Sequence, residues 1–453
     1  MRLWHVIGRA GMRLAGVVVL CGAAAATSSL HVPARPWPSA LAPMPVVAVF
    51  PQIRLPVAQP ARGPFGGYTP AQIRAAYSVR PLLRRGINGK GTSIAIVDSF
   101  GSPTIRRDLA VFDRQFGLRA PRLMIIHPAG RIPKFNDQNQ LMLEWADETT
   151  LDVEWAHVMA PAARIVLVET PVSENEGTSG FPQIVKAEKY VLAHHLGEVI
   201  SQSFGATEET FPMGKLRPLR AAYYEAAQRG HDVTVLAASG DFGATDYRTN
   251  MSTLYTRRVV DWPSSDPLVT GVGGLDLNLN QAGRRLAPDR VWNDFGGAAG
   301  GGKSVVFNRP AFQNGVASAV GRRRGVPDVS LSASCGDPVD VYSSFGGAQW
   351  STICGTSEAT PLFAGIVALA DQVAGRPVGP INGFLYAMAA RHDRGIVDIT
   401  RGNNTFTFDQ NGKHYTVRGW NAVRGYDLSS GLGTVDAQYF VPELAAMARN
   451  AHQ

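Results

Sequence analysis

Short apolar runs alternate with longer stretches of helical spacing along most of the chain. Five runs are typical of buried strands, namely residues 94–97, 123–126, 164–168, 199–201 and 233–237. Between them lie four helical candidates, residues 103–116, 139–159, 181–195 and 215–229. This alternation is typical of α/β folds in which helices cover both faces of a mainly parallel sheet. We therefore expect one large α/β domain over residues 67–450.

The first 66 residues lack this alternation. Three arginines precede the apolar run 14–26, which is too short to span a bilayer and ends in alanines, so residues 1–26 predict a secretory signal peptide. A short membrane anchor and a lipid anchor on Cys21 are the alternatives. The proline-rich residues 27–66 predict a linker or short pro-segment. We expect a secreted protein, extracellular or periplasmic, with no stable membrane span after signal removal.

Composition narrows the class of protein. The chain has 453 residues, of which 45% are hydrophobic and 18% charged, so it can bury a large core. The net charge is +8, but no dense run of Lys and Arg with interleaved aromatic residues occurs. Nucleic-acid binding is therefore not expected. We expect a soluble monomer.

Two cysteines remain once the predicted signal peptide is removed. Cys335 and Cys354 flank the strand-like stretches 339–342 and 349–353, which are joined by two glycines. In an oxidising compartment this arrangement predicts a disulfide that closes a hairpin. Two free thiols are the alternative.

Residues 355–365 read Gly-Thr-Ser-Glu-Ala-Thr-Pro-Leu-Phe-Ala-Gly and lead into an apolar run. The pattern predicts a helix that begins near Ser357, where unpaired backbone N–H groups and the positive helix end can stabilise negative charge. Pro361 suits the first turns because we expect its missing N–H to be one that would be unpaired anyway. Ser357 is then either an N-cap or a nucleophile that needs a base.

Two carboxylates are candidates for that base. Glu148 and Asp152 lie four residues apart in the predicted helix 139–159 and share one face beside an apolar stripe. Two acids held close together and partly buried share a proton, and the pKa of one of them rises. A solvated acidic helix face is the alternative interpretation. His157, on the same helix, is another candidate base.

The segments around these residues resemble the sedolisins, which are serine-carboxyl peptidases related to the subtilisins. The matching motifs are Gly-Thr-Ser-x-Ala-Thr-Pro-x-x-Ala-Gly, and Glu-x-x-x-Asp-x-Glu followed by Ala-Pro-x-Ala-x-Ile. The resemblance implies a subtilisin-like fold in which Ser357 is the nucleophile, Glu148 its base and Asp152 the proton-sharing partner. It also implies that Asp241, which follows the run 233–237, stabilises the oxyanion. An Asx-turn aspartate is the alternative for Asp241.

Further segments match the substrate-binding walls of the family. These are Ser203, Phe204 and Gly205, and the triplet Gly300, Gly301 and Gly302. Residues 297–304 also fit the Gly-x4-Gly-Lys-Ser phosphate motif, but a phosphate loop needs a helix after it and Pro310 leaves no room for one, so no nucleotide is expected. Asp98 aligns with an accessory acid of some relatives.

Two C-terminal loops resemble the calcium site of the family. By this resemblance Asp398 and Asp427 supply carboxylates, and Ile399, Val423 and Gly425 supply carbonyl oxygens, to one Ca²⁺ ion. Hard oxygen ligands of this kind suit calcium. Two turn aspartates without a metal are the alternative.

The sequence thus predicts a secreted serine endopeptidase that hydrolyses peptide bonds in protein or peptide substrates at acidic pH. Acid is expected because both the shared proton and a protonated Asp241 require it. A secreted peptide-binding homologue without turnover, and a subtilisin-type peptidase that depends on His157, remain alternatives. Glu358 is expected to add charge beside the nucleophile.

Overall fold

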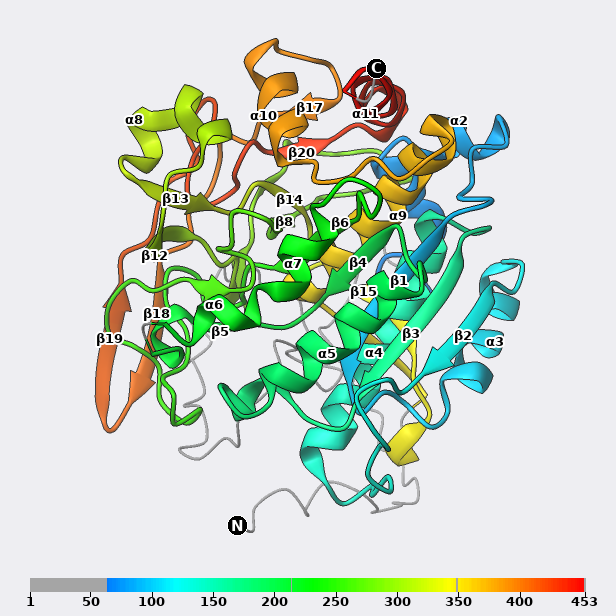
Figure 1. Cartoon of the computed structure of the whole chain (residues 1–453), viewed down its shortest axis with the longest axis horizontal. Helices are drawn as coiled ribbons and strands as arrows, with labels where there is room; N and C mark the ends of the chain where they lie inside the picture. The colour runs from blue at the N-terminus through cyan, green and yellow to red at the C-terminus, as the bar shows by residue number, and fades with distance from the viewer. Residues whose placement is uncertain (1–62, 213, 348, 452–453) are drawn as a thin grey trace, which may run out of the picture. The chain divides into compact units, whose positions relative to one another are not determined.

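An eight-stranded, mainly parallel sheet runs through the described part of this computed structural model, residues 63–212, 214–347 and 349–451 (Figure 1). Its main path has the order β14-β8-β6-β4-β1-β3-β2, and β9 pairs antiparallel with β8. Its strands are β1 (Ser93–Ser99), β2 (Arg122–Ile126), β3 (Arg164–Thr170), β4 (Val199–Gln202), β6 (Thr234–Ala238), β8 (Thr270–Asp276), β9 (Arg290–Val291) and β14 (Val329–Ser332). All five predicted strands lie in it, which confirms the predicted fold class. The predicted signal peptide and nearly all of the predicted linker lie outside the described residues.

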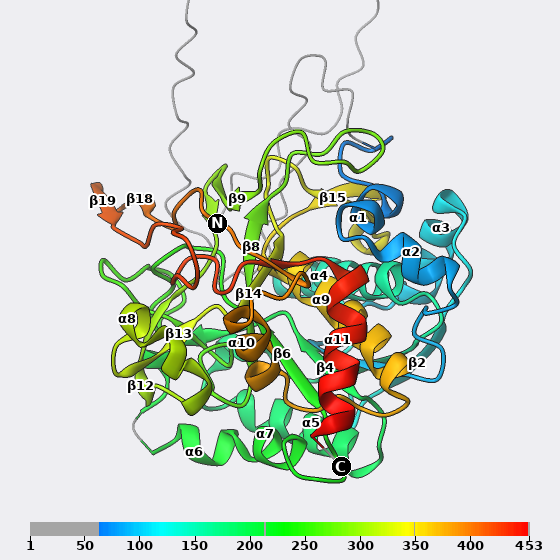
Figure 2. The same cartoon turned by 90° about the horizontal axis from the view of Figure 1, so that it is seen from above.

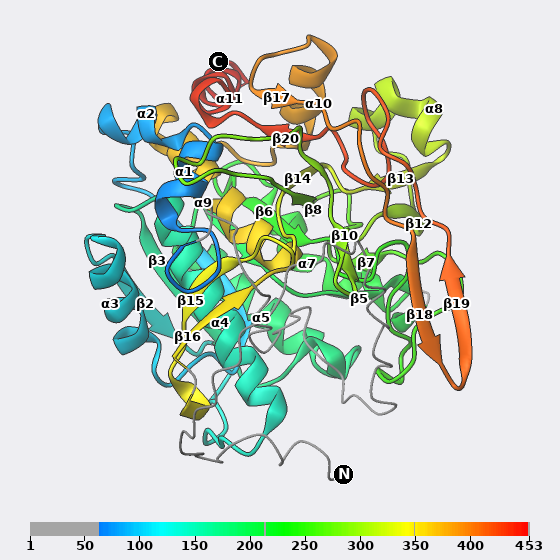
Figure 3. The same ribbon diagram turned by 180° about the vertical axis from the view of Figure 1, so that it is seen from behind.

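Helices cover both faces of this sheet, as predicted. They are α1 (Pro70–Ala76), α2 (Val79–Arg84), α3 (Ile105–Phe116), α4 (Gln140–Met159), α5 (Phe181–Ala193), α6 (Leu216–Leu219), α7 (Ala221–Ala226), α8 (Ala317–Val320), α9 (Thr356–Ala374), α10 (Asn382–Ala390) and α11 (Ala437–Asn450). Helices α5 and α7 lie in front of the sheet in Figure 1, and α9 is seen from the opposite side in Figure 3. The pleat of β1 separates two cores, because Ile94 and Ile96 pack with residues of α4 and α9 while Ala95 and Val97 pack with residues of α5 and α7.

A capping box explains where α1 begins, and an ion pair explains where a predicted helix breaks. Helix α1 starts at Thr69, whose side chain forms a reciprocal capping box with Gln72. The predicted helix 215–229 is instead split into α6 and α7. Arg220 leaves helical geometry between them, with ψ at 4°, where its guanidinium binds the buried Asp266 at 2.5 and 2.8 Å. In the described part of the chain no helix is long and apolar enough to cross a membrane.

Short strand pairs and turns surround the sheet. The remaining strands are β5 (Ala206–Thr207), β7 (Asp261–Trp262), β10 (Asn293–Asp294), β11 (Gly297–Ala298), β12 (Gly302–Asn308), β13 (Arg323–Val326), β15 (Val339–Tyr342), β16 (Trp350–Ile353), β17 (Ile396–Val397), β18 (Phe406–Gln410), β19 (Lys413–Val417) and β20 (Thr434–Val435). The 3-10 turns are η1 (Glu174–Glu176), η2 (Glu208–Thr210), η3 (Ala311–Val316) and η4 (Phe345–Gly347). Cys335 and Cys354 form a disulfide with their Cα atoms 5.0 Å apart, which closes the β15–β16 hairpin just before α9.

Helices α4 and α9 cross in direct contact at the centre of the domain, with α11 alongside α9 (Figure 2). Every residue of α4 from Glu148 to Met159 is buried, so this half of the helix has no solvent-exposed face. A Cβ atom on Gly365 would lie 2.5 Å from the Met159 Cβ and 3.0 Å from the Ala156 carbonyl oxygen. Only glycine permits this approach. The contact matters for the site because α4 carries Glu148 and α9 carries Ser357.

The substitution Gly365→Ala should lower the free energy of unfolding by about 1–3 kcal/mol, because the added methyl group forces two packed helices apart. Chemical denaturation monitored by circular dichroism measures the change. Gly383→Ala on α10 is the matched control, since a Cβ there meets nothing within 4 Å. Equal stability of the two variants would show that the α4–α9 contact does not depend on glycine.

Candidate active site

Ser357 is the second residue of α9 and is fully buried. Gly355 precedes the helix with φ at +120°, a conformation that lets the chain turn sharply from the β15–β16 hairpin into α9. Pro361 lies in the second turn of the helix, so the expectation about its missing N–H is wrong. That N–H would have bonded to the Ser357 carbonyl oxygen, which instead accepts a hydrogen bond from the Ser203 hydroxyl at 3.4 Å.

The structure brings Glu148 and Asp152 of α4 together with Ser357. Burial raises the pKa of Glu148 well above its ordinary value, the charge of Asp152 raises it further, and hydrogen bonding to Ser357 opposes the rise. Burial likewise raises the pKa of Asp152 well above its ordinary value. Both Glu148 oxygens are buried, and neither has a hydrogen bond of ordinary geometry to another described residue.

Ser203 and Asp98 are neighbours of this pair of acids. The Ser203 hydroxyl donates to Asp152 Oδ1 at 2.9 Å, so its side chain points into the acid cluster. The sequence motif predicts Ser203 in a substrate wall, and nothing in the local sequence indicates this contact with Asp152. Asp98, near the end of β1, is buried as well; burial raises its pKa to about 7, and its charge raises the pKa values of Glu148 and Asp152. Asp98 therefore acts on the pair through its charge, and neither of its oxygens has a hydrogen-bond partner among the described residues.

Asp241 lies on the loop that follows β6 and is held from one side. Its Oδ1 accepts hydrogen bonds from the backbone N–H and the hydroxyl of Thr356, both at 2.8 Å. Its Oδ2 is buried and has no hydrogen-bond partner among the described residues. Burial raises the pKa of Asp241 to about 8. Because Oδ1 is occupied as an acceptor, the proton of the neutral acid belongs on Oδ2, which is then a free donor.

The glycine triplet is bonded to the loop that carries Asp241. The Gly300 N–H donates to the Gly240 carbonyl at 2.7 Å, and the Ser239 hydroxyl donates to the Gly300 carbonyl at 2.8 Å. A Cβ on Gly300 would lie 1.9 Å from the Ser239 carbonyl oxygen. No helix follows this loop, since β12 begins at Gly302. The segment therefore has the geometry of a wall beside Asp241 and not that of a phosphate loop.

The other residues singled out in the sequence lie around this centre in different ways. Phe204 is buried in the core on the α5 side of the sheet. Gly205 packs against Asp261, since a Cβ on Gly205 would lie 3.2 Å from the Asp261 Cβ. His157 is fully buried on α4 and faces Asp113 at 3.1 Å. Glu358 is buried against Ser332, and burial raises its pKa well above its ordinary value. Burial thus disfavours the charged form of Glu358, and the expectation that it adds charge to the site stays a prediction.

The predicted calcium residues meet at one loop, residues 423–427. Asp398 Oδ2 accepts from the Gly425 N–H at 2.9 Å, and Asp427 Oδ2 accepts from the Val423 N–H at 3.0 Å. Ile399, next to Asp398, is buried. Both carboxylates thus accept from N–H groups of this loop, and carboxylate and carbonyl oxygens are the donor types that calcium prefers. Among the described residues no group of three His, Cys, Asp or Glu side chains could hold a metal.

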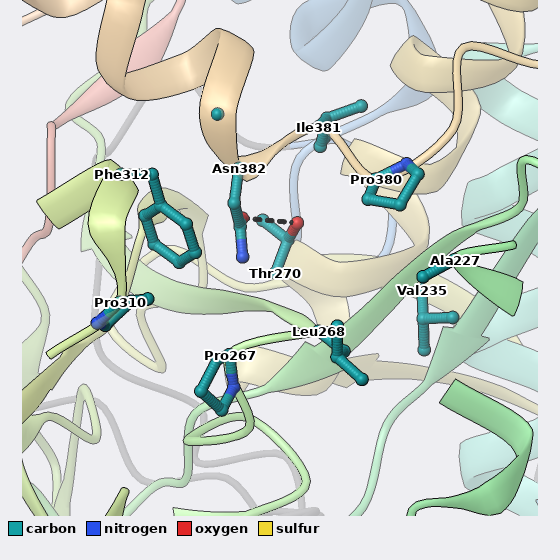
Figure 4. A pocket seen from close by; sticks show the side chains of 11 residues that line it. Ala227, Val235, Pro267, Leu268, Thr270, Pro310, Phe312, Pro380, Ile381 and Asn382 are labelled. Carbon is teal, nitrogen blue, oxygen red and sulfur yellow. Dashed lines mark hydrogen bonds between the residues drawn. The ribbon is translucent and has the colours of Figure 1, made fainter. Parts of the chain in front are cut away.

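A separate apolar pocket of about 310 Å³ lies at the other end of the sheet, where β6 and β8 begin (Figure 4). Its lining includes Val235, Pro267, Leu268, Phe312 and Ile381. Its two polar side chains satisfy each other, since the Thr270 hydroxyl donates to Asn382 Oδ1 at 2.8 Å. In parallel sheets reactive groups collect at the carboxyl ends of the strands, so this pocket is not part of the site.

Several known proteins resemble this chain in sequence, and one of them also in its solved structure. Residues 136–378 match the Subtilase family (Peptidase S8). Kumamolisin from Bacillus sp. (strain MN-32) is 32% identical over 422 residues, which cover 88% of this chain and 70% of kumamolisin. Sedolisin from Pseudomonas sp. (strain 101) is 26% identical over 86% of this chain and 62% of sedolisin. Human tripeptidyl-peptidase 1 is 28% identical over 63% of this chain and 50% of the relative.

The chain thus spans between half and 70% of the length of these relatives. Among solved structures, Pseudomonas sedolisin, a serine-carboxyl proteinase complexed with two molecules of pseudo-iodotyrostatin, superimposes with a TM-score of 0.69 at 25% identity. The match covers 86% of this chain and 99% of that one. Fold and sequence agree that the chain belongs to the sedolisin family of serine-carboxyl peptidases, which has a subtilisin-like fold.

Proposed function

We propose that the protein is a secreted endopeptidase that hydrolyses peptide bonds at acidic pH. The observation that carries the proposal is the placement of a buried serine hydroxyl beside two buried carboxyl groups, with a third carboxyl group, that of Asp241, held next to it by Thr356. A serine needs a base to become a nucleophile, and a proton-sharing carboxyl pair is such a base in acid. His157 faces Asp113 on another side of α4, which speaks against a histidine base.

In this mechanism Ser357 attacks the carbonyl carbon of the peptide bond while Glu148 takes the proton of its hydroxyl. Asp152 shares that proton and is itself oriented by Ser203. Asp241 donates a hydrogen bond from Oδ2 to the developing oxyanion. Glu148 then returns the proton to the leaving amine, and water attacks the acyl-enzyme by the same route in reverse order.

We also propose that one Ca²⁺ ion binds at the loop 423–427. Asp398 and Asp427 would provide carboxylates, and Ile399, Val423 and Gly425 would provide carbonyl oxygens. A bound divalent ion neutralises the two acids and ties the segment after β17 to the segment before β20. Its role here is to stabilise the fold, and no catalytic step requires it.

The activity test uses the full protein on acid-denatured casein and on internally quenched peptides between pH 3 and pH 8. We expect hydrolysis on the acidic side, and a loss of turnover of roughly 10³-fold or more in Ser357→Ala and Glu148→Gln. Asp241→Ala should lose about 10²–10³-fold because it removes one oxyanion donor.

His157→Gln is the control for this series, since His157 lies on the same helix but faces Asp113. Persistent activity in Glu148→Gln together with its loss in His157→Gln would overturn the carboxyl mechanism. Peptide binding without any cleavage by the wild type would instead identify a homologue that lacks turnover.

Stability should fall as pH rises from about 4 to about 8. Burial raises the pKa of Asp98 and Asp340 to about 7, and that of Glu169 and Glu188 to about 8. The folded state therefore holds protons that the unfolded state, with acids of pKa about 4, has already lost. Each such group costs up to about 1.4 kcal/mol per pH unit within its window. Urea denaturation at pH 4, 6 and 8 measures the slope.

Glu188→Gln should flatten that slope, because the amide keeps the bond that Gln202 donates to Glu188 Oε1 and cannot ionise. Asp137→Asn, at an exposed position, is the control and should leave the slope unchanged. A stability that rises with pH in the wild type would contradict the prediction.

Removal of calcium with EGTA should lower the melting temperature of the wild type by several degrees, since a ligand stabilises only the state that binds it. Asp398→Asn should melt at the lower temperature with or without added calcium. Asp409→Asn, on the exposed β18–β19 hairpin, should respond to EGTA as the wild type does. Identical melting curves of the wild type with calcium and with EGTA would rule out the ion.

A further inference from the structure

Asn404 is a fully buried amide outside the regular elements, just before β18. It belongs to the segment between the two predicted calcium-binding aspartates, and no role has been assigned to it above. The β18–β19 hairpin that follows it projects at the edge of the molecule in Figure 3. Three different parts of the chain converge on this one side chain and its peptide group.

The first contact closes the base of the hairpin. Asn404 Oδ1 accepts a hydrogen bond from the Trp420 N–H at 2.7 Å, and the Asn404 N–H donates to the Trp420 carbonyl at 3.2 Å. A Cβ on Gly419 would lie 2.3 Å from Asn404 Oδ1, so the returning chain passes directly against the amide. The amide oxygen, Asn404 Oδ1, thus serves as an acceptor at the base of the hairpin.

The second contact reaches the glycine triplet. Asn404 Nδ2 donates to the Gly301 carbonyl oxygen at 3.3 Å. Gly300, which precedes Gly301, is hydrogen-bonded to Gly240, and Gly240 in turn precedes Asp241. The donor side of the amide therefore holds the wall that lies beside the oxyanion residue.

The third contact reaches the oxyanion loop itself. The Asn404 carbonyl oxygen accepts from the Ala244 N–H at 3.0 Å, and a Cβ on Gly243 would lie 2.5 Å from that oxygen. Two residues further on, the Phe406 ring packs edge-on against Phe242, with centroids 5.7 Å apart. Phe242 directly follows Asp241, so this contact braces the loop on which Asp241 sits.

We propose that Asn404 is a positioning residue that locks the glycine triplet and the Asp241 loop into one rigid unit, and so holds the oxyanion donor in place. Only an amide of this length serves both sides, because it donates from one end and accepts at the other. Alanine offers neither group, and an ionised carboxylate would face the Gly301 carbonyl oxygen without a proton to donate. The inference rests on the proposed peptidase function.

The test compares wild type, Asn404→Ala and Asn403→Ala. Asn403 is the matched control because it is the neighbouring amide and, among the described residues, its side chain accepts only from the nearby Thr405 N–H. Each variant is assayed for kcat and KM with a quenched peptide, and for inhibition by a peptide aldehyde and by the corresponding peptide alcohol. The aldehyde forms a hemiacetal with Ser357, whose oxygen occupies the oxyanion position, whereas the alcohol forms none.

We expect kcat of Asn404→Ala to fall about 10- to 100-fold, which is part of the effect of removing an oxyanion donor altogether. Affinity for the aldehyde should fall by a similar factor, while affinity for the alcohol, and KM, should change less than about threefold. A loss of folded fraction alone would lower the apparent kcat but leave KM and both inhibition constants unchanged, so a selective loss of aldehyde affinity separates a positioning role from a merely structural one. Asn403→Ala should match the wild type.

Asn404→Asp provides a second readout and a conservative variant in case the alanine variant does not fold. When protonated, the introduced carboxyl can still donate to Gly301 and accept from Trp420, so its activity relative to wild type should be highest near pH 3 and fall as pH rises. The charged and titratable groups on the segments that contact Asn404 or its neighbours include Asp241, Asp246, Tyr247, Arg258, Lys303, Arg401 and Arg418. They are common to both proteins, so the ratio of the two pH profiles isolates position 404.

Any of three results would overturn the proposal while leaving the peptidase function intact. One is an active wild type with Asn404→Ala indistinguishable from Asn403→Ala, and another is an equal loss of aldehyde and alcohol affinity. A ratio of Asn404→Asp to wild-type activity that stays flat with pH would also contradict it. A wild type that cleaves no peptide at any pH would instead refute the proposed function, and this inference with it.

Discussion

The packing of α4 against α9 is the constraint on which the site depends. It encloses two carboxyl groups and a serine hydroxyl where water cannot solvate a charge, and the glycine at position 365 lets the two helices come close enough for this. Burial and the neighbouring carboxyl group both raise the pKa of Glu148, so ionising both acids at once is unfavourable. The proposed mechanism uses this same burial, because it requires a pair of carboxyl groups that shares one proton.

The loop that carries Asp241 is linked to Ser357 through a single residue, Thr356. Thr356 precedes Ser357 and donates twice to Asp241 Oδ1, so the loop after β6 and the first turn of α9 cannot shift independently. Ser203, after β4, joins the acid pair to the Ser357 carbonyl oxygen in a similar way. Neighbouring strands of a parallel sheet end at the same edge, and that topology brings these loops together.

The C-terminal loops extend this support outward. Residues between β17 and β20 reach back to the glycine triplet and to the loop that carries Asp241, with Asn404 at the junction. The predicted ion-binding loop lies in the same region of the chain. A hairpin far from Asp241 in sequence thus packs against the loop that carries it, through Phe406 and Phe242.

The amino-acid sequence by itself determined the α/β class, the positions of five strands, the helical spacing that sets Glu148 above Asp152, and the motif that contains Ser357. These follow from local patterns, which act over a few residues. It did not reveal β8 or β14. In β8 the apolar pattern is interrupted by Gly273 and Gly274, which the close packing of β14 and the residue after it requires. A Cβ on Gly273 would lie 2.5 Å from Ser330 Oγ, and one on Gly274 would lie 2.8 Å from Ala333 Cβ. Nor did it place Ser203 in the acid cluster, bury Glu358 beside Ser332, or pair the Ser357 carbonyl with a hydroxyl. Only the tertiary structure decided those, because burial, proton sharing and hydrogen-bond partners are set by segments that lie far apart in the chain and meet only when the sheet and its helices have packed.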